Sequence, residues 1–225
     1  LVIEVGGLLR NDTWRMGTGG INATADYAND DVDDSRIKKL GLHIKPWRTS
    51  HTDDPIYICL QNTNSEAWTA GSVDNWLQDM IEHIRYQTDR QIFIRQHPRH
   101  QTKINHIINM HKNIAESRPQ FTQGDKVDFV DKLKTAYCVV NYNSNPAIEA
   151  VLNGVPVVVH ESSLCREVGN GLLCNINNLK MPDRTRWLNK LSYCEWFVDE
   201  IAQGTPWQRL KHKLQHTLSN QWSGI

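Results

Sequence analysis

Short apolar runs that alternate with helical patterns constrain the fold of this chain most strongly. Strand-like runs lie at 56–60, 91–95, 136–141 and 155–160, and the segments between them are long enough to hold a helix. Strands that alternate with helices are typical of βαβ units and a mostly parallel sheet. We therefore expect an α/β fold, with function in the loops that follow the carboxyl ends of these strands.

The expected helices follow from apolar residues at spacings of three and four. They lie at 73–87, 102–116, 126–135, 147–153, 184–202 and 207–219. Nearer the amino end, 1–5 reads as a strand, whereas 8–34 is polar and glycine-rich and reads as a long loop.

A linker-like segment at 46–55 predicts two domains. We expect an N-terminal lobe at 1–54, joined by the C-terminal helix at 206–225, and a second domain at 55–205.

Composition excludes several classes of protein. The 225 residues are 39% hydrophobic and 22% charged, which is typical of a globular chain that buries a core. No run of about 18 apolar residues occurs, so we predict no membrane span. We recognise no signal peptide, and the five cysteines form no C-x-x-C motif, so we expect a cytoplasmic protein. The 25 basic and 25 acidic residues balance, which argues against a strongly basic DNA-binding module.

The loop after the second strand-like run, Arg95-Gln-His97-Pro-Arg99, offers two guanidiniums and one imidazole. Arginine is the natural bidentate partner of phosphate, so this loop indicates an anion site at a strand end. A surface loop with incidental charge is the alternative.

The loop after the third run, Asn143-Ser144-Asn145-Pro146, opens a helix. The amino end of a helix at the carboxyl edge of a sheet can bind a diphosphate through its free N–H groups. Ordinary helix capping by Ser or Asn, followed by Pro, explains the same pattern. Glu149, about one turn further on, is placed to accept hydrogen bonds from a ribose diol, or else to complete a capping box.

Histidines give two further expectations. His160 ends the last strand-like run, where it would contact a sugar or phosphate or serve the structure alone. The histidines between residues 97 and 111 lack a carboxylate or cysteine partner at metal-ligand spacing, so we predict no metal site.

The N-terminal segment places an aromatic residue among arginines. Trp14 and Trp47 lie in the polar N-terminal segments, which also carry Arg10, Arg15 and Arg48. An exposed aromatic among these arginines could stack on a base or a sugar ring of an acceptor. Packing between lobes is the alternative. Trp76, Trp187 and Trp207 instead occupy core-like helical positions.

The order of the pieces between residues 90 and 170 resembles the nucleotide-sugar half of GT-B glycosyltransferases. These pieces are Arg95-Gln-His97-Pro98-Arg99 and Ser144-Asn-Pro-Ala-Ile-Glu149-Ala150-Val-Leu-Asn-Gly154-Val-Pro156. The resemblance implies a GT-B-like fold, with a Rossmann-like parallel sheet domain and a small or truncated N-terminal acceptor lobe. The paired glutamates of the retaining pattern are absent, since Asn141 stands where the first would be.

The resemblance also implies roles for individual residues in binding a nucleotide-sugar donor, with a UDP-sugar favoured. His97 and Arg99 would touch the donor phosphates, Ser144 and Asn145 the diphosphate, and Glu149 the ribose. The donor is a co-substrate, so we expect no cofactor, and the cationic loop would neutralise the leaving diphosphate without a metal.

Residues 3–48 resemble glycosyltransferases encoded by bacteriophages, through Gly6-Gly7, Arg10-Asn-Asp-Thr-Trp-Arg15, Gly20-Ile-Asn22 and Lys45-Pro-Trp-Arg48. Some relatives of that kind are thought to modify hydroxymethylated pyrimidines in phage DNA. This resemblance implies DNA as a partner and the host cytoplasm as the compartment. An inverting enzyme also needs a general base on the acceptor side, for which Asp12 and Asp26 are the candidates and an Asx-turn role for Asp12 the alternative.

Other functions remain open at this point. A capsule or other cell-surface glycan is the alternative acceptor. A sugar-nucleotide enzyme such as an epimerase would need a second carboxylate, for which Glu161 is the candidate. A non-catalytic sugar-nucleotide-binding module is the third possibility. The sequence pattern gives no prediction of the oligomeric state.

Overall fold

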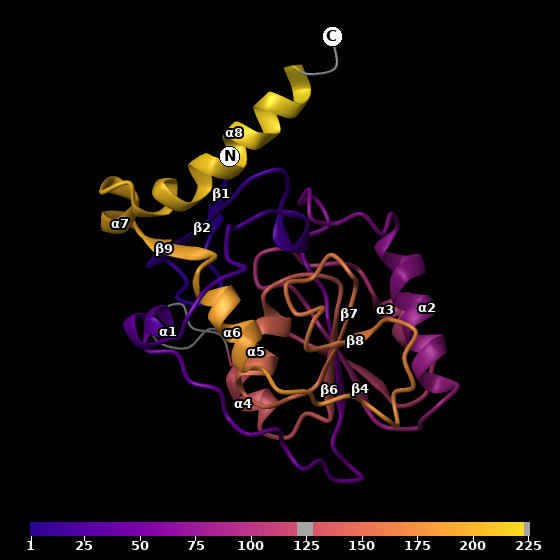
Figure 1. Cartoon of the computed structure of the whole chain (residues 1–225). Coiled ribbons are helices and arrows are strands. Elements are labelled where there is room, and N and C mark those ends of the chain that lie inside the picture. The colour runs from indigo at the N-terminus through magenta and orange to yellow at the C-terminus, as the bar shows by residue number, and fades with distance from the viewer. Residues whose placement is uncertain (121–127, 223–225) are drawn as a thin grey trace. The chain divides into compact units, whose positions relative to one another are not determined.

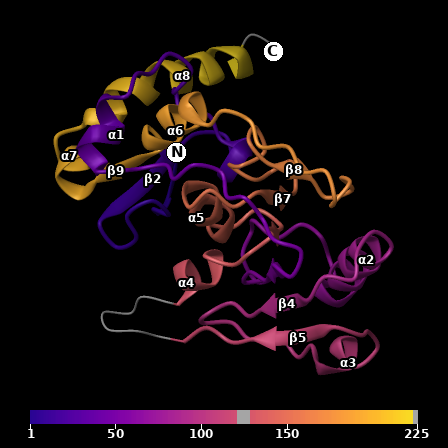
Figure 2. The same ribbon diagram turned by 90° about the horizontal axis from the view of Figure 1, so that it is seen from below.

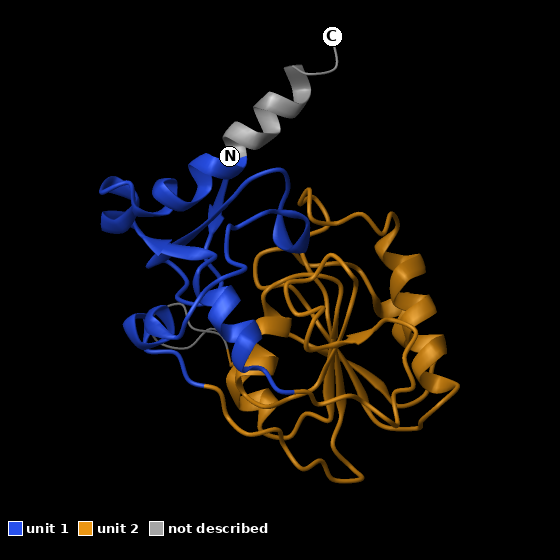
Figure 3. Ribbon diagram, viewed as in Figure 1, with its two compact units in different colours: residues 1–43, 183–225 blue, residues 44–182 orange. Residues whose placement is uncertain are grey.

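A computed structural model of the chain describes residues 1–120 and 128–222, with side chains of the last helix described as far as residue 213. The chain forms two compact units (Figure 3). Unit 1 combines Leu1–His43 with Asp183–Ile225, and unit 2 is the continuous segment Ile44–Pro182. Each unit has a sheet of its own.

Unit 2 is built on a six-stranded sheet in which every strand pair is parallel. The spatial order is β5-β4-β3-β6-β7-β8. The strands are β3 (Ile56–Cys59), β4 (Ile92–Arg95), β5 (Ile114–Ser117), β6 (Cys138–Asn141), β7 (Val157–Val159) and β8 (Asn170–Gly171).

Counted along unit 2, this order is third, second, first, fourth, fifth, sixth, which is the doubly wound order of dinucleotide-binding sheets. The order reverses between β3 and β6, and ligands of such sheets bind in the crevice at the reversal. The predicted α/β fold class with a Rossmann-like parallel sheet is confirmed.

Helices cover both faces of this sheet (Figures 1 and 2). Helices α2 (Val73–Arg85) and α3 (Asn105–Ile108) lie on one face, and α4 (Phe129–Leu133) and α5 (Pro146–Leu152) lie on the other. Strands buried on both faces need apolar residues at nearly every position, which explains the continuous apolar runs in the sequence.

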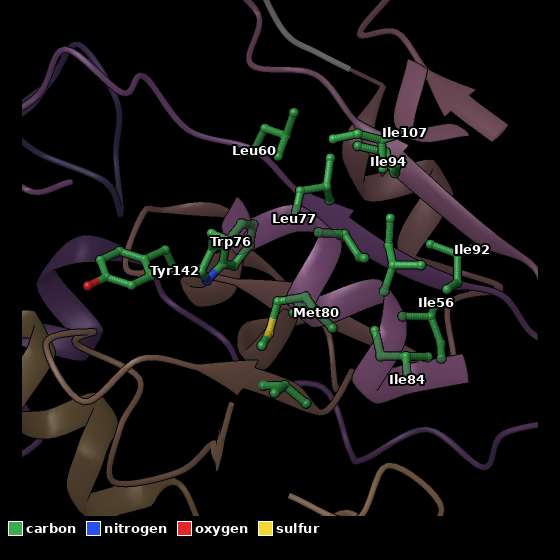
Figure 4. Close-up of a cluster of buried hydrophobic side chains, with 14 of the residues drawn as sticks. Ile56, Leu60, Trp76, Leu77, Met80, Ile84, Ile92, Ile94, Ile107 and Tyr142 are labelled. Atoms are coloured by element: carbon green, nitrogen blue, oxygen red, sulfur yellow. The ribbon is translucent and has the colours of Figure 1, made fainter. Parts of the chain in front are cut away.

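The core beneath α2 is a cluster of buried hydrophobic side chains (Figure 4). Leu77 and Ile81 of α2 are fully buried against Ile56 and Ile58 of β3. Each such side chain contributes roughly 1.5–3 kcal/mol to the free energy of folding through removal of its surface from water. At the start of α2, Ser72 caps the helix by accepting a hydrogen bond from the amide of Asn75, at 3.4 Å.

Unit 1 holds a three-stranded antiparallel sheet in the order β1-β2-β9. Its elements are β1 (Val2–Val5), β2 (Thr13–Gly17), the 3-10 turn η1 (Asn22–Thr24), α1 (Ser35–Leu40), α6 (Thr185–Ser192), β9 (Glu195–Phe197), α7 (Val198–Ala202) and α8 (Thr205–Trp222). Strand β9 comes from the carboxyl-terminal part of the chain and pairs with β2 from the amino-terminal part.

A buried carboxylate holds the amino-terminal loop of unit 1. Glu195 has no solvent exposure and forms an ion pair of 3.0 Å with Arg15. The same carboxylate accepts hydrogen bonds from the amides of Gly7 (2.7 Å) and Leu8 (3.0 Å) and from the hydroxyl of Thr13 (2.8 Å). A buried charge is tolerated when it is paired and hydrogen-bonded in this way.

Three predictions of secondary structure are wrong. Residues 8–34 are not a continuous loop, because β2 lies within them. The predicted helix at 102–116 is the single turn α3, followed by the edge strand β5. The predicted helix at 184–202 is interrupted by β9, since Trp196 pairs across the sheet with Trp14. For the predicted helix at 126–135, α4 is found at Phe129–Leu133, and residues 126 and 127 lie outside the described residues.

The predicted lobes, 1–54 with 206–225 and 55–205, differ from the two compact units in two segments. Residues 44–54 belong to unit 2, and 183–205 belong to unit 1 through the pairing of β9 with β2. As a division by function, into acceptor and donor sides, the lobes remain a prediction. Trp76 and Trp187 are buried as expected, whereas Trp207 is exposed.

Candidate functional site

Hydrogen bonds join the two loops at the point where the strand order reverses. Gln61 follows β3 and Asn143 follows β6, and both side chains are almost completely buried. The Gln61 amide nitrogen donates to Asn143 Oδ1 at 2.9 Å, and the Asn143 backbone amide donates to Gln61 Oε1 at 3.2 Å. These two hydrogen bonds fix the two loops to each other at the reversal of strand order.

The turn that opens α5 is held by Asn141, the last residue of β6. Its side-chain nitrogen donates to the carbonyl of Cys59 at 3.0 Å and to Ser144 Oγ at 2.9 Å. Its oxygen accepts from the Ser144 amide at 2.8 Å. These bonds place Ser144 and Asn145 immediately before the first residue of α5, Pro146.

Glu149 is the carboxylate of this region that has no partner. Glu149 lies within the first turns of α5 and is half-buried, and its carboxylate makes no hydrogen bond or ion pair with any residue that the structure describes. Burial raises the pKa of the Glu149 carboxyl, and the positive charge of Arg95 opposes this only in part. No capping box involving Glu149 forms at α5, so that alternative to a binding role is not realised.

Arg95 ends β4 and is occupied by a partner inside unit 2. It forms an ion pair of 2.6 Å with Asp128, and its guanidinium lies over the ring of Phe129 at 5.1 Å from the centroid. Burial by itself would raise the pKa of the Asp128 carboxyl, but hydrogen bonds from Arg95 and from the Gln120 amide lower it. Arg95 thus contributes its charge to the site, while its side-chain hydrogen bonds go to Asp128 and Ser117.

The other two cationic residues of the loop after β4 are closer to solvent. His97 is partly exposed and Arg99 is exposed. The Arg99 amide donates to His97 Nδ1 at 3.2 Å, which closes the loop and leaves the guanidinium of Arg99 outward. An anion could reach this guanidinium without first breaking an ion pair of the fold.

His160 follows β7 and lies against an aromatic ring. Its imidazole stacks on Tyr142, with 4.4 Å between the ring centroids and an interplanar angle of 15°. Its Nδ1 lies 2.8 Å from Ser162 Oγ. His160 also lines an open cleft of about 580 Å³ at the ends of β7 and β8, whose other lining residues include Glu161, Arg166 and Leu173.

The acceptor-side candidates are divided between the two units. Arg10, Trp14 and Arg15 belong to unit 1, whereas Arg48 belongs to unit 2, where it pairs with Asp54 at 2.6 Å. Arg10 and Trp14 are exposed. Arg15 is buried with Glu195, so its charge stabilises the interior of unit 1.

The two candidate bases of unit 1 differ in their surroundings. Asp26 accepts a hydrogen bond from the Ala28 amide at 2.8 Å and pairs with Lys213 at 3.2 Å. Asp12 is exposed in the turn between β1 and β2, and its carboxylate makes no hydrogen bond with a described residue. The Asx turn that was the alternative for Asp12 is therefore found at Asp26 instead.

Sequence reasoning missed Gln61, Tyr142 and Ser162, which connect the strand-end loops to one another. Each lies within three residues of the end of a parallel strand, and that position was the only available signal.

Comparison with known proteins finds structures of similar fold, but no family or curated protein that matches in sequence. No protein-family model matches the chain, and no curated protein matches it in sequence. Among solved structures, it is similar to the beta Kdo 2,7 transferase of Thermosulfurimonas dismutans KpsC, with 15% identity, a TM-score of 0.57, and coverage of 87% of this chain and 70% of that one. It is also similar to the beta Kdo 2,4 transferase of the same KpsC, with 11% identity, a TM-score of 0.51, and coverage of 84% and 68%.

The chain shares their fold. At these identities the likeness does not extend to substrates. Within the described residues, no helix is long and apolar enough to span a membrane, and no three His, Cys, Asp or Glu residues gather as a metal site would require.

Proposed function

We propose that this chain is a glycosyltransferase that binds a nucleotide-activated sugar at the carboxyl edge of the six-stranded sheet. The observation that carries the proposal is the unpartnered carboxylate of Glu149, beside the preformed Asn141–Ser144 turn at the reversal of strand order. The similarity in fold to two proteins named as sugar transferases supports the same conclusion.

The proposed donor site divides the nucleotide among the strand-end loops. Ser144 and Asn145, at the start of α5, bind the diphosphate, and His97 and Arg99 add positive charge to it. Glu149 accepts hydrogen bonds from the two ribose hydroxyls, because a free carboxylate offers acceptors on both oxygens. A uridine-linked sugar is the donor we favour.

The proposed reaction breaks the bond between the anomeric carbon and the diphosphate oxygen and forms a bond from that carbon to an acceptor hydroxyl oxygen. The electron pair of the broken bond leaves with the diphosphate, whose charge the cationic loop stabilises without a metal. In an inverting course the hydroxyl proton passes to a general base, and Asp12 is preferred over Asp26 because its carboxylate is exposed and unpaired.

Two acceptors are proposed. The resemblance of residues 3–48 to phage enzymes favours the hydroxymethyl group of a modified pyrimidine in DNA. The names of the two structural neighbours, both transferases of Kdo, favour a carbohydrate acceptor such as a cell-surface glycan.

A donor screen tests the proposal. The chain is incubated with uridine-, guanosine- and cytidine-linked sugars and with nucleotide-activated Kdo, with hydroxymethylpyrimidine DNA or with an oligosaccharide that contains Kdo. Mass spectrometry of digested nucleosides and of the oligosaccharide detects the added sugar. A sugar mass on either acceptor supports the transferase and identifies its acceptor. If no donor gives either turnover or a thermal shift, the proposal is overturned.

The same screen separates the alternatives. A donor that shifts the melting temperature and is recovered unchanged indicates the binding module. A donor that is converted to an isomeric sugar nucleotide without an acceptor indicates an epimerase-like enzyme, which would need Glu161 as its second carboxylate.

A further inference from the structure

The imidazole of His160 stacks on a neighbouring ring with one face and is hydrogen-bonded at one nitrogen, Nδ1. Tyr142 covers one face of the imidazole, and the Tyr142 hydroxyl is itself tied to Thr69 at 2.8 Å. His160 is also one of the residues that line the cleft at the ends of β7 and β8. This arrangement fixes the plane of the ring relative to the cleft.

The hydrogen bonds at Nδ1 fix the position of the proton of the neutral ring. The Ser162 backbone amide lies 3.3 Å from Nδ1, and an amide N–H only donates. This long bond favours Nδ1 as the acceptor, and so favours the proton of the neutral imidazole on Nε2. Nε2 makes no hydrogen bond with any described residue, so its N–H is available to a ligand in the cleft that His160 lines.

A second hydrogen bond to Nδ1 comes from the Ser162 hydroxyl, and the side-chain amides of Asn143 and Gln61 fix its direction. The side-chain nitrogen of Asn143 donates to Ser162 Oγ at 2.9 Å, so the Ser162 hydroxyl has its own proton left to donate to His160 Nδ1, at 2.8 Å. Asn143 cannot turn over, because its oxygen accepts from Gln61 and its nitrogen also donates to the Ala67 carbonyl at 2.7 Å. The hydrogen bonds between Gln61 and Asn143 thus help to set the tautomer of His160.

We propose that His160 Nε2–H donates a hydrogen bond to an oxygen of the bound donor nucleotide in this cleft, and that Ser162 is the positioning residue that keeps the proton on Nε2. The inference rests on the proposed function for the identity of the ligand. Leu172 and Leu173 offer an apolar wall beside His160, and Leu173 is largely exposed. A planar or sugar ring with oxygen acceptors at its edge matches an apolar wall with one fixed donor.

Nuclear magnetic resonance tests the positioning role without any ligand. In chain labelled with ¹⁵N at histidine, the His160 signals are assigned by their loss in His160→Gln. We expect wild-type His160 to carry its proton on Nε2. Ser162→Ala loses the 2.8 Å bond from the hydroxyl and keeps only the longer bond from the amide, at 3.3 Å, so we expect it to populate both tautomers. Ser162→Thr, which keeps the hydroxyl, should restore the wild-type pattern. A mixed tautomer in the wild type, or an unchanged one in Ser162→Ala, would overturn the positioning role.

Calorimetry with UDP, CDP and GDP tests recognition by His160. We expect His160→Ala to weaken binding about tenfold, whereas His160→Gln should lose little, because its amide can place an N–H near the position of Nε2. Ser162→Ala should weaken binding several-fold and Ser162→Thr should not. His106→Ala is the matched control, since His106 is exposed on α3 and pairs with Asp74. Thermal melting confirms that each variant is folded.

The outcomes separate this inference from the proposed function. If the wild type binds a nucleotide and His160→Ala binds it equally well, recognition by His160 is wrong and the proposed function stands. If the wild type binds none of the three nucleotides and no sugar nucleotide, the proposed function and recognition by His160 fail together. The tautomer measurement still decides the role of Ser162 in that case.

Discussion

At the scale of single residues, the candidate site combines side chains that have partners with one that has none. Asn141 and Asn143 use their amide groups within the fold, so they hold the loops in place. Glu149 keeps a partly buried carboxylate without a hydrogen bond, although burial makes its charge costly. A group that is retained at a cost to stability is a candidate for binding.

Glu149→Gln should therefore separate stability from binding. Because the pKa of Glu149 is raised in the folded chain, the protonated form favours folding, and this contribution is lost as pH rises through the folded pKa. At pH 7 the neutral glutamine should leave the melting temperature unchanged or raise it. Nucleotide affinity should fall roughly 10- to 100-fold, since the bonds lost are to a charged acceptor.

Calorimetry and thermal melting at pH 7 measure the two effects of Glu149→Gln. Glu82→Gln, at an exposed position of α2, serves as the control and should change neither. A variant that melts lower and binds equally well would show that Glu149 has a structural role.

The identity of the site residues could be predicted from the sequence better than their partners could. Ser144 and Glu149 follow a strand and open a helix, and this is a local pattern. The partners of Arg95 and Arg15 are distant in sequence, Asp128 by 33 residues and Glu195 by 180. Ion pairs at such separations depend on tertiary structure, so no local pattern distinguishes these buried arginines from exposed ones.

At the scale of elements, the turn from α5 to β7 depends on a glycine. Gly154 has a φ of 78°, in the left-handed region that favours glycine. A Cβ at this position would also overlap the carbonyl oxygen of Pro46. Since this turn connects the helix that carries Glu149 with the strand that ends near His160, its geometry sets the distance between two parts of the site.

Gly154→Ala should destabilise the chain far more than the same change at Gly204. Gly204 has a similar φ of 75°, but a Cβ there meets open space, so only the conformational cost of about 1–2 kcal/mol applies. At Gly154 the overlap with backbone adds to that cost, and we expect a loss of more than about 3 kcal/mol in the free energy of unfolding. Urea unfolding measures both variants, and equal losses would contradict the steric argument.

The first turn of helix α7 carries a carboxylate that has several hydrogen-bond donors around it. Glu200 pairs with Arg36 at 2.8 Å and Lys39 at 2.7 Å, and accepts from the Phe197 amide at 2.9 Å. Burial would raise the pKa of Glu200, but these bonds lower it from 4.5 to about 2. Its stabilising contribution is therefore present above about pH 4.5 and is lost as pH falls towards 2.

Glu200→Gln should consequently cost about 2–3 kcal/mol of unfolding free energy at pH 7, and the difference from wild type should shrink below pH 4.5. Chemical unfolding at a series of pH values measures this difference. Asp199→Asn, exposed on the same helix, is the control and should show no such trend. A difference that stays constant from pH 7 to pH 2.5 would show that the charge of Glu200 is not what stabilises α7.

The type of an element was predicted well where its segment has a clear apolar pattern. It was predicted poorly where pairing across the sheet determines whether the segment is a strand. The strands β3, β4, β6 and β7 are apolar on both faces, and each was found within two residues of its predicted start. Strand β5 is a half-buried edge strand with the sequence IAES, which carries no strand pattern of its own. In β9, Trp196 fits a helical spacing, and only its pairing with β2 makes it a strand.

At the scale of the whole molecule, unit 2 is continuous in sequence and unit 1 is not. Unit 2 contains all six strands of the parallel sheet and all donor-site candidates, whereas unit 1 combines the two ends of the chain. The two ends of unit 2 are also tied to it. Trp47 donates from Nε1 to the carbonyl of Pro182 at 2.9 Å, and the Arg48 amide donates to the carbonyl of Gly154 at 2.7 Å.

The segment Ile44–Pro182, expressed alone, should therefore fold cooperatively and keep the nucleotide affinity of the whole chain. Its core cluster and its terminal hydrogen bonds lie within the segment, so folding needs no residue of unit 1. Circular dichroism during urea unfolding measures cooperativity, and calorimetry with UDP and CDP measures binding. A segment that begins at Arg48, without Trp47, is the matched control and should unfold at lower urea. If Ile44–Pro182 is unfolded while the whole chain is folded, unit 1 is needed to stabilise the parallel sheet. If it folds without binding while the whole chain binds, unit 1 contributes residues to the nucleotide site.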